Sequence, residues 1–309
     1  MNLENCLPKD TVLDRYQIIG PVSKGGFSVV YLALDLQNKQ QVIIKEYMPK
    51  NQAKRLRNYY VTPICASKAT LFQKGRMLFF QEASILATLK HPNIVNVINF
   101  FRANGTVYMV MEFEDGDNLQ SYIKKKHRNG LSERFLLTVF PELLEGLHQV
   151  HESGFLHLDI KPGNIHIRPG GRPLLIDFGS VHRRELSRLH QPGQVMTAGY
   201  APIEQFNKTG YIGPWTDLYA IGATMRSCLE GRPPIDSRRR HQNDEMLSAK
   251  TLFKKQCRKE LLEAIDWCME LDPMLRPQSV PELLERLPKL EDMPKPHQWL
   301  MRLTGSTRR

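Results

Sequence analysis

The 309-residue sequence lacks the features that mark membrane, secreted and repeat proteins. No apolar run approaches the ~20 residues of a transmembrane helix, and the polar residues 1–5 are unlike a signal peptide. The five cysteines are an odd number without a C-x-x-C pair, which argues against a disulfide framework and a zinc site. Internal repeats and low-complexity tracts are absent as well. We therefore expect a cytoplasmic globular protein with reduced thiols and no membrane span.

Acidic residues are fewer than basic ones. The chain has 43 Lys and Arg against 32 Asp and Glu, a net charge of +11 with His neutral. This excess suits an acidic partner, whether nucleotide, nucleic acid, anionic membrane or acidic protein, but a solvated basic surface explains it equally well. No nucleic-acid-binding motif accompanies the charge, so we do not expect a nucleic-acid partner. Nothing in the sequence predicts the oligomeric state.

Two carboxylates, a lysine and a carboxamide stand close together in the middle of the chain. Asp159, Lys161 and Asn164 form the pattern H-x-D-x-K-P-x-N, and Asp177 follows the apolar residues 174–176. These groups can hold a divalent metal on a polyphosphate while a carboxylate steers an incoming hydroxyl. Phosphoryl transfer depends mainly on positioning and charge neutralisation, so the stretch predicts that chemistry.

Hydrophobic periodicity divides the chain into a strand-rich part and a helix-rich part. β-Branched and aromatic runs between residues 14 and 45 predict three antiparallel strands, and the basic stretch 50–68 predicts loops. A long helix is expected over 131–153, with a kink or local break at Pro141. The remaining predicted elements are a helix at 72–89, strands at 94–101 and 106–113, a short helix at 119–126, and mostly helix to about residue 288.

These motifs resemble the eukaryotic-like serine/threonine protein kinases, bacterial type, over residues 11–290. The resemblance is carried by S-K-G-G-F-S-V-V at 23–30, K-E-Y-M-P at 45–49, the H-x-D-x-K-P-x-N stretch, D-F-G at 177–179, T-A-G-Y-A-P-I-E-Q at 197–205 and D-P-M-L-R-P at 272–277. It implies an α+β, bilobal protein-kinase fold, with a small antiparallel-sheet N-lobe holding one main helix and a larger, mostly helical C-lobe. The lobes are expected at 11–113 and 114–290, between a loose lead-in at 1–10 and a flexible basic tail at 291–309.

The resemblance also implies an activity, the transfer of phosphate from ATP to Ser and Thr hydroxyls of protein substrates. Asp159 would orient the substrate hydroxyl and accept its proton, and Lys161 would neutralise charge on the moving phosphoryl group. Lys45 would hold the nucleotide phosphates, with Glu82 as its ion-pair partner. These four residues are the predicted catalytic set.

The implied cofactors are ATP and Mg²⁺. Asn164 and Asp177 offer the oxygen ligands that Mg²⁺ prefers. Glycines in the first turn would let the backbone approach the phosphates closely. The predicted nucleotide-binding residues are Val22, Ser23, Lys24, Gly25, Gly26, Phe27, Ser28, Val30, Ile43, Lys45, Met111, Glu112, Phe113 and His166.

The nucleotide pocket departs from the family pattern. Ser23 and Ser28 replace two loop glycines, Ile43 replaces the usual alanine above the purine, and His166 replaces the usual leucine beneath it. Overpacking alone can cost roughly 1–3 kcal/mol, about a tenfold loss of affinity. A pseudokinase-like binding or scaffold protein is therefore the alternative to an active kinase, and a small-molecule phosphotransferase fits less well.

Further resemblances concern regulation and support. Leu158 stands where many family members have an arginine that receives a phosphate, so we predict weak dependence on phosphorylation at Ser187 or Thr197. Asp217 matches a structural aspartate in a buried helix. Arg276 is expected to pair with Glu204.

Overall fold

The computed structural model describes residues 5–126, 130–178, 182–183, 196–207 and 210–292. Its chain forms two compact units, each described separately below. Unit 1 comprises Met1–Gly116 and Ile176–Val181, and unit 2 comprises Asp117–Leu175 and His182–Arg309. None of the described helices has the length and apolar character that crossing a bilayer requires.

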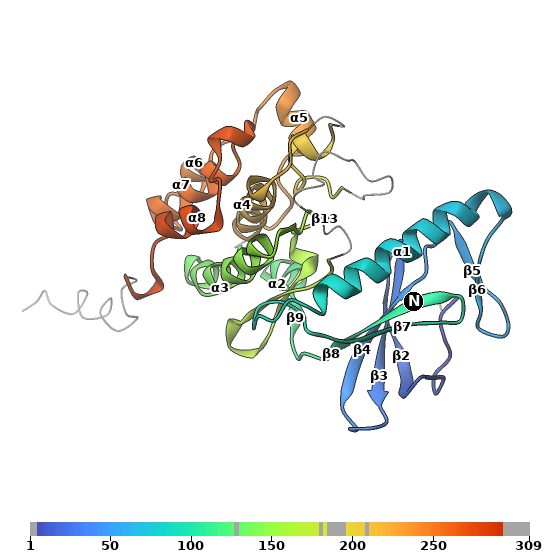
Figure 1. Ribbon diagram of the computed structural model, residues 1–309. Helices are drawn as coiled ribbons and strands as arrows, with labels where there is room; N and C mark the ends of the chain where they lie inside the picture. Colours follow the sequence, from blue (N-terminus) through green and yellow to red (C-terminus); the bar gives the residue numbers. More distant parts are fainter. Residues whose placement is uncertain (1–4, 127–129, 179–181, 184–195, 208–209, 293–309) are drawn as a thin grey trace, which may run out of the picture. The chain divides into compact units, whose positions relative to one another are not determined.

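Unit 1 is built on a six-stranded sheet in which every strand pair is antiparallel (Figure 1). The strand order is β1-β2-β3-β4-β8-β7. The bounds are β1 (Val12–Leu13), β2 (Tyr16–Lys24), β3 (Ser28–Asp35), β4 (Gln41–Tyr47), β7 (Val97–Ala103) and β8 (Thr106–Glu112). The three strands predicted between residues 14 and 45 are therefore present, as are the two predicted later ones.

The sheet is most deeply buried at its centre. Strand β3 alternates between half-buried and buried positions, as expected for a sheet with two unlike faces, while β8 is buried at every position but its last. Strand β4 lies between them and pairs with both. The backbone of Lys45, near the end of β4, is thereby held by a strand on each side.

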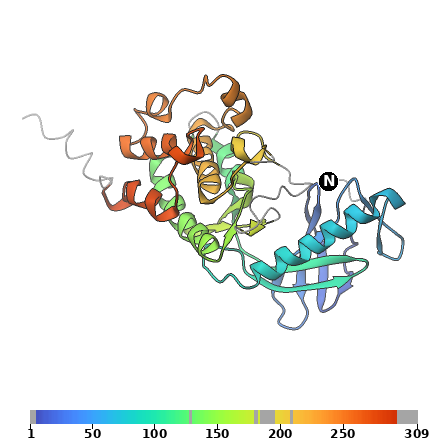
Figure 2. The same cartoon turned by 45° about the horizontal axis from the view of Figure 1, so that its top comes forward.

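One long helix, α1 (Ala69–Leu86), covers a face of this sheet in both views (Figures 1 and 2). It begins and ends three residues before the helix predicted at 72–89. Its buried residues include Phe72, Phe79, Ala83 and Leu86, which recur at helical spacing. This stripe packs α1 on the sheet and directs Glu82, which lies next to it, inward.

The basic stretch predicted as loops contains a hairpin instead. Strands β5 (Ala53–Arg55) and β6 (Val61–Pro63) pair with each other, and a 3₁₀ turn (Ala66–Lys68) leads into α1. The hairpin is held by a contact with the main sheet, because Arg55 donates to the fully buried carboxylate of Glu46 on β4. Such a long-range ion pair leaves no trace in local periodicity, so the loop prediction was wrong here.

The lead-in is also packed against unit 1 from residue 5 onward. Leu7 is 2% exposed, and its backbone N–H donates to the Tyr31 hydroxyl at 3.0 Å. The backbone carbonyl of Asn5 accepts from Arg55 at 3.0 Å. Residues 5–10 are therefore part of the folded unit and not a loose segment.

Unit 2 is mostly helical, with short strand pairs beside the helices (Figure 2). The predicted 131–153 helix is α3 (Glu133–Glu152), and all twenty of its positions are helical, Pro141 included. The local break expected at Pro141 is absent, since the apolar stripe on both sides of it is buried and outweighs the lost hydrogen bond. The short helix predicted at 119–126 is α2 (Leu119–Lys126).

The core of unit 2 is helix α4 (Pro214–Glu230), which is buried at every position before Glu230. It packs against α3 and α7 (Lys259–Cys268), and α8 (Val280–Arg286) covers α3 and α7. The other described elements are α5 (Ser237–Gln242), α6 (Ala249–Leu252), the sheet of β9 (Asp117–Asn118), β11 (Ile165–Ile167) and β12 (Pro173–Leu175), and the pair β10 (Phe155–Leu156) with β13 (His182–Arg183). Ser187 and most of the predicted basic tail lie outside the described residues.

Candidate active site

Lys45, Glu82 and Asp177 meet within unit 1. The Lys45 Nζ atom lies 2.7 Å from Asp177 Oδ1 and 3.3 Å from Glu82 Oε1. The side chains of Lys45 and Glu82 are each 9% exposed, whereas that of Asp177 is 46% exposed. The predicted contact between Lys45 and Glu82 is thus present. Asp177 is a second carboxylate partner of the Lys45 ammonium group.

Burial and the neighbouring charges shift the pKa values of both Lys45 and Glu82. Burial alone lowers the pKa of Lys45, but Asp177 and Glu82 outweigh burial and raise it above its usual value. Burial raises the pKa of Glu82, against the lowering effect of Lys45. Lys45 therefore stays a cation, held ready between two carboxyl groups.

The turn between β2 and β3 and the strand residues on either side of it carry most of the predicted nucleotide-binding residues. Gly25 N–H donates to Ser28 at 2.8 Å, and the carbonyls of Gly26 and Phe27 accept from Lys50 and Met48, both at 2.9 Å. A Cβ on Gly26 would meet no atom within 4 Å, so this side of the turn is open. Its predicted members Val22, Ser23, Gly25, Gly26 and Phe27 are exposed, and Lys24, Ser28 and Val30 are half-buried.

The bulky residue expected above the purine has a defined neighbour. Ile43 on β4 is half-buried and pairs in register with Met111 on β8, which is 9% exposed. Glu112 and Phe113 follow, and both are exposed. Ile43 and Met111 are therefore neighbours across two strands, and Glu112 and Phe113 continue the chain from Met111.

The carboxylate of Asp159 is the centre of a hydrogen-bonded cluster in unit 2. Lys161 Nζ donates to both of its oxygens, at 2.9 and 2.7 Å. Thr197 donates to Oδ1 at 3.1 Å, and Asn164 Nδ2 donates to Oδ2 at 2.9 Å. With a side-chain exposure of 16%, Asp159 is fixed by donors alone, which is the setting of an ionised carboxylate.

Asn164 can hold only one orientation in this cluster. Its Nδ2 also donates to the backbone carbonyl of Asp159, at 2.8 Å. Both partners of Nδ2 are pure acceptors, so the side-chain oxygen Oδ1 must point away from Asp159. That oxygen is the atom with which Asn164 could bind a cation.

Asp217 holds the backbone of the segment that leads to Asp159. It accepts from the backbone N–H groups of His157 and Leu158, at 2.9 and 2.7 Å, and is bonded to His151 Nε2 at 2.8 Å. Burial alone raises the pKa of Asp217, but the bonds from His151 and His157 outweigh burial and lower it. Asp217 is therefore an anion in the core of unit 2.

A second buried ion pair in unit 2 joins Glu204 and Arg276, as predicted. The Arg276 guanidinium donates to both carboxylate oxygens of Glu204, at 2.7 and 3.1 Å. The Thr216 hydroxyl also donates to Glu204, at 3.1 Å. The Arg276 guanidinium also lies 4.7 Å from the centre of the Tyr219 ring. The pair fixes the segment that follows Thr197.

The predicted catalytic and metal-binding residues are thus gathered into two sets, one in each unit. Lys45, Glu82 and Asp177 form the set of unit 1, and Asp159, Lys161 and Asn164 that of unit 2. His166 is placed on β11, in register with Asn118 on β9 and Leu174 on β12. Groups of three or more His, Cys, Asp or Glu that could hold a metal do not occur among the described residues.

Sequence reasoning missed two of the contacts. The sequence presents Thr197 as a phosphorylation site and as the first residue of a family motif, yet its hydroxyl also bonds to both Asp159 and Lys161. Its place at the start of T-A-G-Y-A-P was the available signal. The role of His151 as a partner of Asp217 had no signal, because a histidine on the buried face of a helix is usually a core residue.

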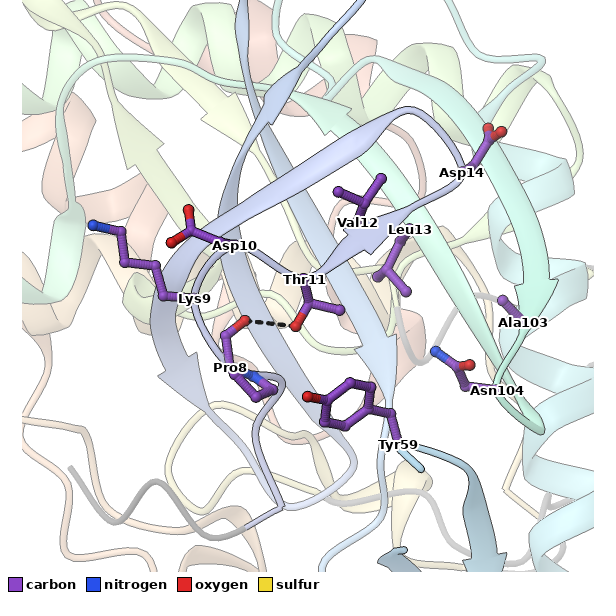
Figure 3. A pocket seen from close by; sticks show the side chains of 10 residues that line it. All are labelled: Pro8, Lys9, Asp10, Thr11, Val12, Leu13, Asp14, Tyr59, Ala103 and Asn104. Carbon is purple, nitrogen blue, oxygen red and sulfur yellow. Dashed lines mark hydrogen bonds between the residues drawn. The ribbon is translucent and has the colours of Figure 1, made fainter. Parts of the chain in front are cut away.

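A cavity of about 460 Å³ in unit 1 lies apart from these residues (Figure 3). It is lined by residues 8–14, Tyr59, Ala103 and Asn104, and none of them belongs to the predicted site. The Thr11 hydroxyl bonds to the Pro8 carbonyl at 2.9 Å on its wall. The cavity is a feature of the packed lead-in.

Comparison with known proteins gives consistent matches over almost the whole chain. The family described as the protein kinase domain matches residues 16–286. Serine/threonine-protein kinase PknA of Nostoc sp. is 30% identical over 286 residues, covering 89% of this chain and 47% of that protein. Serine/threonine-protein kinase D of Synechocystis sp. is 29% identical and covers 90% of this chain and 53% of that protein. The chain thus spans about half the length of these relatives.

Solved structures agree with these matches. The structure titled PpkA-294 apo form has a TM-score of 0.82 at 34% identity, covering 92% of this chain and 100% of that one. The PknI kinase domain of Mycobacterium tuberculosis has a TM-score of 0.66 at 19% identity and covers 91% of this chain and 98% of that one. At this identity the likeness shows the fold alone.

Proposed function

Because the chain belongs to the protein kinase family, we propose that it transfers the terminal phosphoryl group of Mg-ATP to Ser and Thr hydroxyls of protein substrates. The predicted resemblance to bacterial-type serine/threonine kinases and the predicted fold class are confirmed. The pseudokinase alternative finds no support in the comparisons. A cytoplasmic location stays a prediction.

The observation that carries the proposal is the set of donors around Asp159. With four donated hydrogen bonds, Asp159 is an oriented anion that can accept a bond from a substrate hydroxyl and take its proton. Lys161, 25% exposed, bridges Asp159 and Thr197 and keeps a positive charge beside the reacting hydroxyl. This charge would offset the negative charge of the moving phosphoryl group.

The chain also offers groups that fit a nucleotide. Lys45 lies on a strand that is paired on both sides, and Glu82 and Asp177 hold its ammonium group in place. We propose phosphate contacts from Lys45 and the backbone of Gly25 and Gly26, where side chains are absent. The remaining proposed nucleotide contacts are Val22, Ser23, Lys24, Phe27, Ser28, Val30, Ile43, Met111, Glu112, Phe113 and His166.

The proposed metal ligands fit Mg²⁺ in donor chemistry. Asn164 directs its amide oxygen away from Asp159, and about half of the Asp177 side chain is exposed. Both are hard oxygen donors of the type that Mg²⁺ prefers. When bound with ATP, Mg²⁺ supplies positive charge that neutralises the phosphates.

Autophosphorylation and phosphorylation of a basic Ser/Thr-containing protein, both with γ-labelled ATP, test the proposal. Asp159→Ala should reduce label by about a thousandfold or more, since it removes the general base and the anchor of Lys161. The matched control is Glu285→Gln, an exposed acidic residue on α8. Mass-spectrometric mapping should find phosphate on Ser and Thr only.

Equal label on wild type and Asp159→Ala would overturn the proposed activity. A thermal-shift titration with Mg-ATP separates binding from chemistry. A stabilised Asp159→Ala protein without label is the result that we expect.

A further inference from the structure

The K-E-Y triplet at residues 45–47 has a physical role beyond that of its lysine. We propose that Tyr47 is a positioning residue that sets helix α1, and hence Glu82, against Lys45. The inference deepens the proposed function and rests on it. Lys45 and Tyr47 lie two positions apart on β4 and therefore point to the same face, toward α1.

Tyr47 contacts α1 through two aromatic rings. Its ring centre is 5.5 Å from that of Phe72 and 5.8 Å from that of Phe79, and Tyr47 is 4% exposed. Phe72 and Phe79 are two helical turns apart, on one face of α1, and Glu82 follows Phe79 by three residues on that face. Tyr47 thus packs against the same face of α1 that carries Glu82.

Gly75 makes this close approach possible. A Cβ on Gly75 would overlap the Tyr47 hydroxyl oxygen and would lie 2.8 Å from its Cζ. Gly75 is inside an 18-residue helix and shows no left-handed backbone, so its conformational freedom is not used there. Since glycine is a poor helix former, its place opposite Tyr47 is explained by the contact alone.

Phe79 links the contact to the ion pair itself. Its ring centre lies 5.5 Å from Lys45 Nζ, within the range of a cation–π interaction. Phe79 therefore touches both Tyr47 and Lys45, and Glu82 is one turn away. A shift of α1 that disturbs Tyr47 must change the Lys45–Glu82 distance, now 3.3 Å.

The strand cannot easily move in place of the helix. On the other face of β4, the fully buried Glu46 accepts from the hydroxyls of Tyr31 and Tyr108, each at 2.8 Å, and from Arg55. These donors come from β3, β8 and the β5–β6 hairpin. Because β4 is anchored in this way, a change at Tyr47 moves α1 and not the strand.

The variant Gly75→Ala tests the inference, with Tyr47→Phe and the double variant as partners. Gly75→Ala adds a methyl group that pushes α1 from Tyr47, so kcat/KM for ATP should fall by between about tenfold and a hundredfold, as expected for a displacement near 1 Å. The double variant lacks the overlapping hydroxyl and should recover part of that loss. Gln73→Ala, exposed on the same helix, is the control.

Lys45 reactivity provides a readout that needs no phosphotransfer. The acylation rate of Lys45, followed by mass spectrometry as a function of pH, reports how firmly its ion pair is held. Lys45 Nζ is now buried and bonded to Glu82 and Asp177, so a displaced α1 should leave the amine more accessible. Gly75→Ala should therefore be acylated faster than wild type, and the double variant should lie between. This result would support the inference even if no kinase activity were found.

Two results would overturn the inference. One is wild-type reactivity of Lys45 and wild-type kcat/KM in folded Gly75→Ala. The other is wild-type Lys45 reactivity and wild-type kcat/KM in folded Tyr47→Leu, because the ring contacts to α1 would then have no effect. If thermal unfolding shows that Gly75→Ala does not fold, Tyr47→Leu removes the ring contacts without adding bulk, and the same two measurements decide.

Discussion

The backbone N–H of Leu158 donates to Asp217 Oδ1 at 2.7 Å and holds a leucine in the left-handed region, at φ 61°. Bulky residues rarely adopt this conformation, and a second bond, from Gln205 to the Leu158 carbonyl at 2.9 Å, helps to maintain it. Leu158 directly precedes Asp159. The anion buried in α4 thereby sets the direction of the proposed catalytic base.

Phosphorylation at Ser187 should have little influence on activity, whereas a phosphate on Thr197 would remove the hydroxyl that donates to Asp159. Leu158 is apolar and 7% exposed, so it gives a phosphate no cationic partner at the position where many kinases have arginine. We expect phosphatase-treated protein and protein phosphorylated at Ser187 to agree in kcat/KM within about twofold, because a phosphate orders a segment chiefly by pairing with Arg. A large loss of activity after phosphatase treatment would refute this.

Replacing Asp217 should destabilise the protein in a pH-dependent way. Asp217→Asn removes the buried anion that holds Leu158 and His151, and should cost about 3–5 kcal/mol at neutral pH. The folded pKa of Asp217 is lowered, so its contribution is complete above the unfolded value near 3.8 and is lost as pH falls through the folded value.

Urea unfolding at a series of pH values measures this difference in the free energy of unfolding. The gap between wild type and Asp217→Asn should be constant from neutral pH to just above the unfolded pKa and should narrow below it. The control is the exposed Asp292→Asn. A gap that widens toward acid would contradict the assigned direction of the shift.

Breaking the Glu204–Arg276 pair from one side should be severe. Arg276 is 2% exposed and Glu204 is 4% exposed, so Arg276→Met leaves a buried carboxylate without its main partner. The expected cost is about 3–5 kcal/mol in the free energy of unfolding. The double variant Glu204→Gln/Arg276→Met should recover part of it, and identical single and double variants would argue against coupling between the two side chains.

Trimming Ile43 should improve nucleotide binding. Ile43 is only half-buried, and the family resemblance places alanine there, so Ile43→Ala removes bulk that costs roughly 1–3 kcal/mol when it overpacks a ligand. Calorimetric titration with Mg-ATP should show a dissociation constant lower by about tenfold. Ile19→Ala, at an exposed position on β2, is the control. Unchanged or weaker binding would mean that Ile43 fits the purine as it is.

Some of the site could be predicted because its parts are close in sequence. Asp159, Lys161 and Asn164 lie within six positions, so one turn brings them together and the motif alone predicts their contact. The contact of Lys45 with Glu82, 37 residues away, was predicted through the family resemblance and not through any local pattern. The roles assigned to all of these residues stay predictions.

Other features could not be predicted. The β5–β6 hairpin consists of two three-residue strands with no apolar alternation, and its main anchor is the ion pair of Arg55 with Glu46. The packing of Leu7 depends on a hydroxyl 24 residues away. Gly75 reads as an unfavourable residue in a helix until Tyr47 is seen beside it.

The sequence by itself determined the family, the order of the main strands and helices, and the residues of the Asp159 segment, because these depend on local spacing and periodicity. Only the tertiary structure decided that Asp217 holds Leu158, that Thr197 joins Asp159 and Lys161, and that Tyr47 meets Gly75. Each of these contacts joins distant parts of the chain. Burial and long-range hydrogen bonding decide such contacts, and neither can be predicted from the residues next to them in the sequence.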